Sequence, residues 1–173
     1  MKNLFCSLRL VALLLLVATN TLSIQAETVT HTFGELGAQF SDGNATVTLP
    51  DGLVYHCTNT TFGINSGRIC AMMNTSGAAL TLANTMSELS GLRINYDPTN
   101  TALDSTNIAI YLSTDGEEWT QVTKGFTAIK GSFLASGFAP NDYYVRIERA
   151  SGLAFYIFSI AYTLSPCSCL EVK

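Results

Sequence analysis

The stretch NIAIYLSTDGEEWTQVT, residues 107–123, is the clearest guide to the fold of the chain. The apolar residues of its first half recur at every second position, at Ile108, Ile110 and Leu112. This period is typical of a strand that buries one face. Asp115 and Gly116 follow, a pair that tolerates the positive φ angles of a tight hairpin turn, and a strand-like pattern resumes at residues 118–122. The stretch therefore predicts an antiparallel β-hairpin.

Short strand-like segments recur on both sides of this hairpin. They lie at residues 27–33, 45–49, 53–57, 69–73, 78–82, 89–97, 126–129, 132–135, 141–149 and 153–163. Turn residues separate them, and none has a convincing helical period. The chain is 47% hydrophobic and only 13% charged, which suits two sheets packed face to face. The sequence therefore predicts an all-β fold, an antiparallel β-sandwich of jelly-roll type.

The first 26 residues differ in character from the rest. Lys2 and Arg9 precede a short apolar run, residues 10–18, and Ala26 supplies a small residue at a cleavage point. The run is shorter than the roughly 20 residues that a membrane-spanning helix needs. We therefore expect a secretory signal at residues 1–26, a β-sandwich domain at 27–165 and a short Cys-containing tail at 166–173. The protein is then secreted or on the cell surface.

The charge distribution bears on the class of partner. Loss of residues 1–26 removes Lys2 and Arg9 and no acidic residue, so the formal net charge falls from −4 to about −6. The remaining cations are scattered, whereas a nucleic-acid partner requires them to be clustered. No second apolar run is long enough to span a membrane. We therefore expect neither a nucleic-acid partner nor a membrane span in the mature chain.

Four cysteines follow the predicted signal: Cys57, Cys70, Cys167 and Cys169. Export permits disulfides, and four cysteines allow three pairings. Cys57 and Cys70 flank one loop in strand-like segments, so this pair is our first choice, with a stabilisation of about 3 kcal/mol in the chain-entropy model. A zinc site is the alternative, although the spacing matches no common zinc pattern.

Two parts of the sequence resemble a known class of module. They are YLSTDGEEW at residues 111–119, and the pair of segments DYYVRI at 142–147 and YIFSI at 156–160. They are similar to the hairpin and last strands of secreted bacterial jelly-roll β-sandwich modules of the carbohydrate-binding type, over residues 89–163. Glu117 stands where the family hairpin has a second glycine. The resemblance implies a module that accompanies polysaccharide-degrading enzymes or surface adhesins, with a polysaccharide or other glycan as partner.

Aromatic and polar side chains on one surface are the feature that sugar binding requires, because C–H faces stack on rings while hydroxyls take directed hydrogen bonds. Trp119 is the single tryptophan, and Tyr144, Arg146 and Glu148 share the polar face of one predicted strand. These four residues form a hypothetical saccharide platform if they lie on the same surface. The alternative is that Trp119 packs into the core.

A structural calcium ion is a further expectation, because lectin-like jelly-roll modules often hold one. Asp97, Asn100 and Asp104 lie in one loop interrupted by proline, and calcium takes six to eight oxygen ligands. The sequence lacks the regular spacing of an EF-hand. No other cofactor is expected.

Catalysis finds little support in the sequence. His56 lies near Asp51, and Asp115 lies near Glu117 and Glu118, but a histidine at a sheet edge and solvated turn carboxylates explain these patterns better. We therefore expect a non-catalytic extracellular carbohydrate-binding-like module. The alternative is a protein-interaction or adhesin-type structural module, part of a larger surface protein. A small secreted hydrolase is a third and weaker hypothesis.

Overall fold

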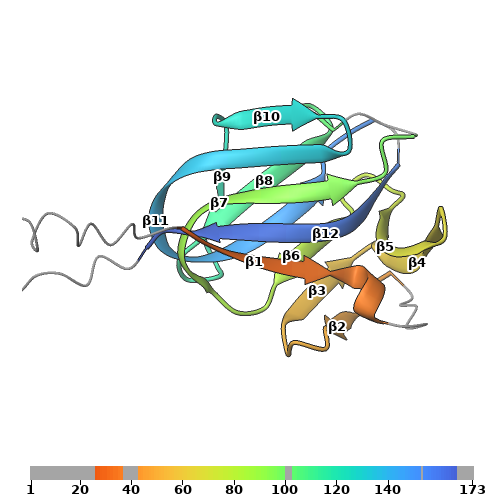
Figure 1. The fold of residues 1–173 in the computed structure, drawn as a ribbon, viewed down its shortest axis with the longest axis horizontal. Coiled ribbons are helices and arrows are strands. Elements are labelled where there is room, and N and C mark those ends of the chain that lie inside the picture. The colour runs from red at the N-terminus through yellow and green to blue at the C-terminus, as the bar shows by residue number, and fades with distance from the viewer. Residues whose placement is uncertain (1–25, 37–42, 100–102, 153, 167–173) are drawn as a thin grey trace, which may run out of the picture.

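A computed structural model describes residues 26–36, 43–99, 103–152 and 154–166. These residues form twelve strands and one short 3-10 turn, η1 (Phe33–Leu36) (Figure 1). The strands are β1 (Glu27–Thr32), β2 (Thr46–Thr48), β3 (Val54–Thr58), β4 (Thr61–Asn65), β5 (Arg68–Met73), β6 (Ala79–Leu82), β7 (Met86–Tyr96), β8 (Ile108–Ser113), β9 (Thr120–Gln121), β10 (Phe126–Ile129), β11 (Ser132–Arg149) and β12 (Phe155–Leu164). Among these residues, no helix is long and apolar enough to cross a membrane.

The strands form two antiparallel sheets that share one long strand. Sheet A has the order β10, the first part of β11, β7 and β12. On its other side, β12 pairs with β1 over residues 159–164 and with β5 over residues 155–157. β4 completes this sheet beside β5. Sheet B has the order β2, β3, β6, the second part of β11, β8 and β9. In Figure 1, β11 curves from one sheet into the other. The predicted antiparallel β-sandwich is confirmed.

The core lies between the sheets because inward positions alternate with outward ones along most strands. Leu92, Ile94 and Tyr96 of β7 are buried in it, and Val145 and Ile147 of β11 line it from sheet B. Burial of each such side chain contributes roughly 1.5–3 kcal/mol relative to exposure. The outward face predicted for Tyr144, Arg146 and Glu148 is therefore opposite the buried face of β11.

One polar cluster crosses the core. His31 of β1 and Tyr162 of β12 belong to sheet A, whereas Tyr55 of β3 belongs to sheet B, and all three are at most 1% exposed. The Tyr55 hydroxyl lies 2.6 Å from His31 Nδ1 and 3.0 Å from the Tyr162 hydroxyl. These contacts join the two sheets by hydrogen bonds within an otherwise apolar interior.

β11 is irregular where it leaves β7. Ser136 pairs with Gly91, and the next paired residue of β11, Asn141, lies opposite Leu89. Five steps along β11 thus match two steps along β7, and residues 137–140 bulge away from the sheet. Such bulges bend a strand and increase its twist, which lets β11 continue into the second sheet.

The structure differs from the sequence prediction in three elements. The loop expected at residues 58–68 contains the strand β4, the segments 132–135 and 141–149 form one strand, and Trp119 precedes β9 instead of lying in it. In the first two cases a polar or glycine-containing stretch keeps backbone pairing without regular side-chain alternation.

The predicted Cys57–Cys70 disulfide is not formed, since both residues are free thiols. Cys57 lies on β3 of sheet B and Cys70 on β5 of sheet A, and each sulfur approaches a main-chain carbonyl, that of Tyr55 at 4.0 Å and that of Gly63 at 3.5 Å. Burial raises the pKa of Cys57 to about 12 and that of Cys70 to about 11, so both thiols stay protonated at neutral pH. The predicted signal at residues 1–26 and Cys167 and Cys169 of the tail lie outside the described residues, apart from Ala26.

Candidate functional site

The outer face of sheet B carries three of the four predicted ligand-binding residues on one strand. Val145 and Ile147 of β11 point into the core, so Tyr144, Arg146 and Glu148 point outward. All three outward residues are partly exposed. This alternation was readable from the sequence, because β11 is regular over residues 144–149.

Strand register extends this outer face across the whole sheet. Arg146 pairs with Thr81 on one side and with Tyr111 on the other. The row continues through His56 to Thr46 at one edge and to Gln121 at the other. Six paired strands at about 4.8 Å spacing make this row about 24 Å long. Glu148 lies between Ala79 and Ala109, which are buried, at 1% and 3% exposed.

Arg146 is tied into the centre of this row. Its Nη2 donates to Glu148 Oε2 at 2.7 Å, and its guanidinium carbon lies 5.9 Å from the centre of the Tyr111 ring. Its Nε has no partner among the described residues. The side chains of Arg146 and Glu148 are 37% and 22% exposed, so a ligand can reach both. Their opposite charges leave the centre of the face electrically balanced.

Trp119 directly precedes β9, the strand beside β8, and β8 pairs with the strand that carries Tyr144. Tyr144 pairs with Ser113, and the β8–β9 register places Leu112 opposite Thr120. Trp119 comes one residue before Thr120, outside the paired residues of β9. Trp119 is partly exposed rather than packed in the core. Tyr144, Arg146 and Glu148 therefore share one face, and Trp119 lies next to the strand at its edge; that the four bind a ligand together stays a prediction.

The turn between β8 and β9 holds this arrangement in place. Asp115 Oδ1 accepts hydrogen bonds from the backbone N–H groups of Glu117 and Glu118, both at 2.9 Å, and from the Ser113 hydroxyl. Gly116 has a φ of 80°, and a Cβ there would lie 3.6 Å from the Tyr144 ring. The turn thus packs against the ring and limits its motion.

The same turn argues against an acid–base role for its carboxylates. Hydrogen bonds from the backbone of Glu117, from that of Glu118 and from Ser113 hold the pKa of Asp115 below its usual value. A general acid in glycoside hydrolysis requires a raised pKa. His56 is exposed, with Nδ1 3.0 Å from the hydroxyl of Thr46 on the edge strand β2; His56 itself lies one strand in from the edge, on β3.

The predicted calcium residues are only partly within the described chain, because Asn100 lies outside it. Asp97 is 5% exposed; its carboxylate accepts hydrogen bonds from Asn65, from Ser66 at 3.0 Å and from the Thr99 N–H at 2.8 Å. The Thr99 side chain and N–H, with Ser66 and Asn65, lower its pKa.

Asp104 uses its Oδ1 in the same way, to accept from the N–H and the hydroxyl of Thr106. Within the described ranges, no three His, Cys, Asp or Glu side chains are grouped so as to hold a metal ion. Calcium binding here stays a prediction.

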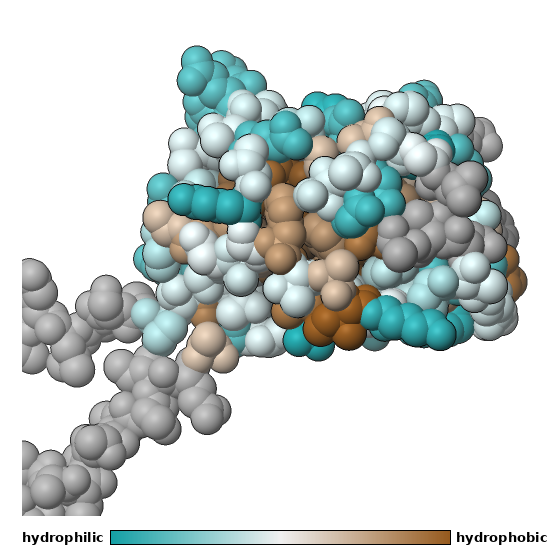
Figure 2. Space-filling model, turned by 90° about the horizontal axis from the view of Figure 1, so that it is seen from above, coloured by the Kyte–Doolittle hydropathy of each residue, from teal (hydrophilic) through white to brown (hydrophobic). Residues whose placement is uncertain are grey.

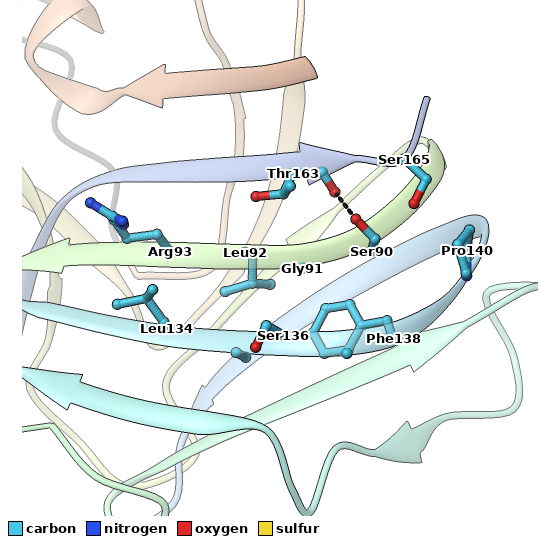
Figure 3. Close-up of a pocket in the computed structure, with 12 residues that line it drawn as sticks. Ser90, Gly91, Leu92, Arg93, Leu134, Ser136, Phe138, Pro140, Thr163 and Ser165 are labelled. Carbon is cyan, nitrogen blue, oxygen red and sulfur yellow. Dashed lines mark hydrogen bonds between the residues drawn. The ribbon is translucent and has the colours of Figure 1, made fainter. Parts of the chain in front are cut away.

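Sequence reasoning missed a cleft on the outer face of sheet A. It has a volume of about 390 Å³ and lies over Gly91, between β11 and β12. Figure 3 shows Arg93 and Leu134 toward one end and Phe138 and Pro140 toward the other. We name it the Gly91 cleft. The only sequence signal for it is the glycine and proline content of residues 137–140, which interrupts the strand pattern.

No known protein family matches the chain, nor does any curated protein sequence. Solved structures with similarity include a family two carbohydrate esterase from Cellvibrio japonicus, at 11% identity and a TM-score of 0.41, over 82% of this chain and 35% of the esterase. This chain thus spans about a third of the esterase's length.

Another similar structure is a low-affinity xylan-binding module from Roseburia intestinalis, at 6% identity and a TM-score of 0.42, over 79% of this chain and 94% of the module. A mutant of a carbohydrate-binding module of family 29 has 12% identity and a TM-score of 0.43, over 85% of this chain and all of that one. The ligand must therefore be argued from this chain's own residues.

Proposed function

We propose that this protein is a non-catalytic carbohydrate-binding module that binds a glycan on the outer face of sheet B. The observation that carries the proposal is the placement of Tyr144 and Tyr111 on one face around Arg146 and Glu148, with the partly exposed Trp119 next to the edge strand β9. With residues 1–26 as a secretory signal, it acts outside the cell or at its surface, alone or within a larger surface protein.

The chemistry of this face suits a sugar. Partly exposed aromatic rings offer an apolar surface to the C–H groups of a pyranose. Arg146 and Glu148 lie beside them as a donor and an acceptor for hydroxyls, and the pairing between them fixes their orientation. Since the two charges balance, the face favours a neutral glycan over an ionic one. A row about 24 Å long leaves room for several sugar residues of a linear chain.

The test uses Trp119 as the single fluorescent tryptophan of the exported protein. Its emission is titrated with soluble xylan, glucomannan and mixed-linkage β-glucan, each with and without calcium. A saturable change with one of them is the expected result. Tyr111→Ala should then weaken that binding about tenfold, because one stacked ring is lost.

Tyr156→Ala is the matched control, because Tyr156 is a partly exposed tyrosine that pairs with Met72 in sheet A. It should leave the affinity unchanged. Binding that responds equally to both tyrosine variants, or no fluorescence change with any of the glycans, would rule out the proposed face.

The second candidate is a protein-interaction or adhesin-type module, and one surface favours it. Figure 2 shows apolar surface gathered on the side of the molecule where β10 lies in Figure 1. Ile129 at the end of β10 is 54% exposed, and among the described strands β10 pairs only with β11. An open edge with an exposed apolar side chain suits pairing with a protein strand. Ile129→Lys would abolish such pairing and leave glycan binding intact.

A further inference from the structure

The Gly91 cleft owes its shape to an interruption of sheet A. Gly91 has no side chain, and the neighbouring strands place Ser136 and Thr163 beside it. Residues 137–140 leave the sheet next to this point and raise Phe138 along one side (Figure 3). The result is a hollow of about 390 Å³ with a flat strand as its floor, within the range of ligand pockets of about 300–1,000 Å³.

The polar groups of the cleft include one cation with no partner. The Arg93 side chain is exposed and makes no hydrogen bond or ion pair with any residue that the structure describes. No Asp or Glu lines the cleft. In a chain with a net charge of −4, this is a local positive site, in contrast to the paired Arg146 of sheet B. A guanidinium with open donors fits a carboxylate in a bidentate manner.

Hydroxyl groups and apolar side chains complete the lining. The Ser90 hydroxyl donates to the Thr163 carbonyl at 3.1 Å, whereas those of Thr163 and Ser165 have no partner within the described part of the chain. Leu134 and the partly buried Phe138 supply the apolar wall. Separated cationic, hydroxyl and aromatic groups match the carboxylate, the hydroxyls and the ring face of an acidic sugar.

We infer that the Gly91 cleft is a second binding site, which takes a hexuronic acid unit of a glycan with its carboxylate on Arg93. The next sugar ring of the chain lies along Phe138. The site is on the opposite side of the sandwich from the sheet B face, so it does not depend on the function proposed for that face. A peptide strand is a poorer occupant, because β7 is paired at Gly91 on both sides and offers no free edge.

The experiment is calorimetric titration of the exported protein with digalacturonic acid. Neutral digalactose, sodium acetate and tetraalanine are titrated in parallel. We expect saturable binding of digalacturonic acid that weakens as salt rises, because an exposed charge pair is screened. The neutral disaccharide should bind at least about tenfold more weakly, the loss expected when one charged hydrogen-bonded pair is absent.

Variants locate the site. Arg93→Gln should weaken digalacturonic acid binding about tenfold, with partial retention in Arg93→Lys. Ser136→Tyr should abolish it by filling the cleft, and circular dichroism checks that this variant is folded. Arg146→Gln is the control on sheet B and should leave it unchanged. Since Trp119 reports only the sheet B face, failure of one site is distinguishable from failure of the other.

Four outcomes would overturn the inference. Equal affinity for acetate would make the cleft an anion site without sugar recognition. Equal affinity for tetraalanine would assign it to peptides. Equal affinity for digalactose would remove the role of Arg93, and so would an Arg93→Gln variant that binds as the parent does.

Discussion

The two outer faces of the sandwich are built from the same strand in opposite ways. Over residues 144–149, β11 is regular, and its outward side chains form a flat surface whose central cation is paired with Glu148. Over residues 136–141 the strand bulges, and it leaves a hollow whose cation, Arg93, is unpaired. Regular pairing thus produces an extended, balanced surface, and broken pairing produces a compact, charged cleft.

This difference has a consequence for stability. A flat face depends on the sheet as a whole, so single changes in its side chains alter binding more than folding. The cleft depends on a few backbone contacts at the bulge. The amide and hydroxyl of Ser136 both bond the Gly125 carbonyl, at 3.0 and 3.3 Å, and this contact fixes the point at which the bulge begins.

The largest expected effect comes from two glycines with nearly the same backbone angles. Gly125 beside the cleft has a φ of 81°, and Gly116 beside Tyr144 has a φ of 80°. A Cβ at Gly125 would lie 2.0 Å from the Ser136 carbonyl oxygen, whereas at Gly116 the nearest atom would be 3.6 Å away. We predict that Gly125→Ala lowers the free energy of unfolding by about 3 kcal/mol or more and Gly116→Ala by about 1 kcal/mol.

Urea unfolding of both variants measures this difference. Equal slopes against urea concentration are the control, since they indicate that the folded and unfolded states stay comparable. Equal losses in the two variants would contradict the close backbone contact at the bulge. In a marginally stable domain, a 3 kcal/mol loss is a large share of the total.

The same contrast explains what the sequence could predict. Alternation at Ile108 to Leu112 and at Tyr144 to Glu148 identified strands, buried faces and the residues that share the sheet B surface. It did so because a regular strand directs every second side chain to one side. β4 was missed because its segment, TFGIN, lies in a polar, glycine-containing stretch with no clear alternation.

The Gly91 cleft and the cysteine pairing depend on geometry that periodicity does not encode. Gly91 and Phe138 are far apart in sequence and meet only because β11 changes register beside β7. Cys57 and Cys70 flank one loop, yet their strands belong to opposite sheets. Register and sheet membership are set by pairing across the whole fold, which a local pattern cannot specify.

The next effect concerns the polar link between the sheets that carry the two faces. Burial lowers the pKa of His31, opposed in part by the charge of Asp51, while burial raises the pKa values of its neighbours Tyr55 and Tyr162. Because the unfolded chain binds a proton more readily, the contribution of neutral His31 is complete above pH about 6.5 and is lost as the pH falls below it. We predict that the free energy of unfolding falls between pH 6.5 and 5 with a slope of at most about 1.4 kcal/mol per pH unit from this group.

The two histidines of the chain provide the comparison for this measurement. His31→Gln should flatten the slope over that interval in urea titrations, and His56→Gln, a change on the exposed face of sheet B, should leave it as it is. Loss of the slope in the His56 variant instead would place the titrating group on the sheet B face. Because the link joins both sheets, Trp119 fluorescence and circular dichroism should report a single transition.

The smallest expected effect is a difference in stability between variants of Arg146 and Arg93, the cations of the two faces. Arg146 has a partly exposed ion pair with Glu148, and such pairs contribute about 0.5 kcal/mol. Arg93 has no partner among the described residues, so its charge contributes nothing of this kind. We predict that Arg146→Gln lowers the free energy of unfolding by about 0.5 kcal/mol and that Arg93→Gln leaves it unchanged within about 0.2 kcal/mol.

Thermal unfolding at low and high salt measures both variants, and high salt should remove the loss of stability in Arg146→Gln. A clear loss of stability in Arg93→Gln would mean that this arginine serves the fold, and the contrast between a structural cation on one face and a free cation on the other would fail.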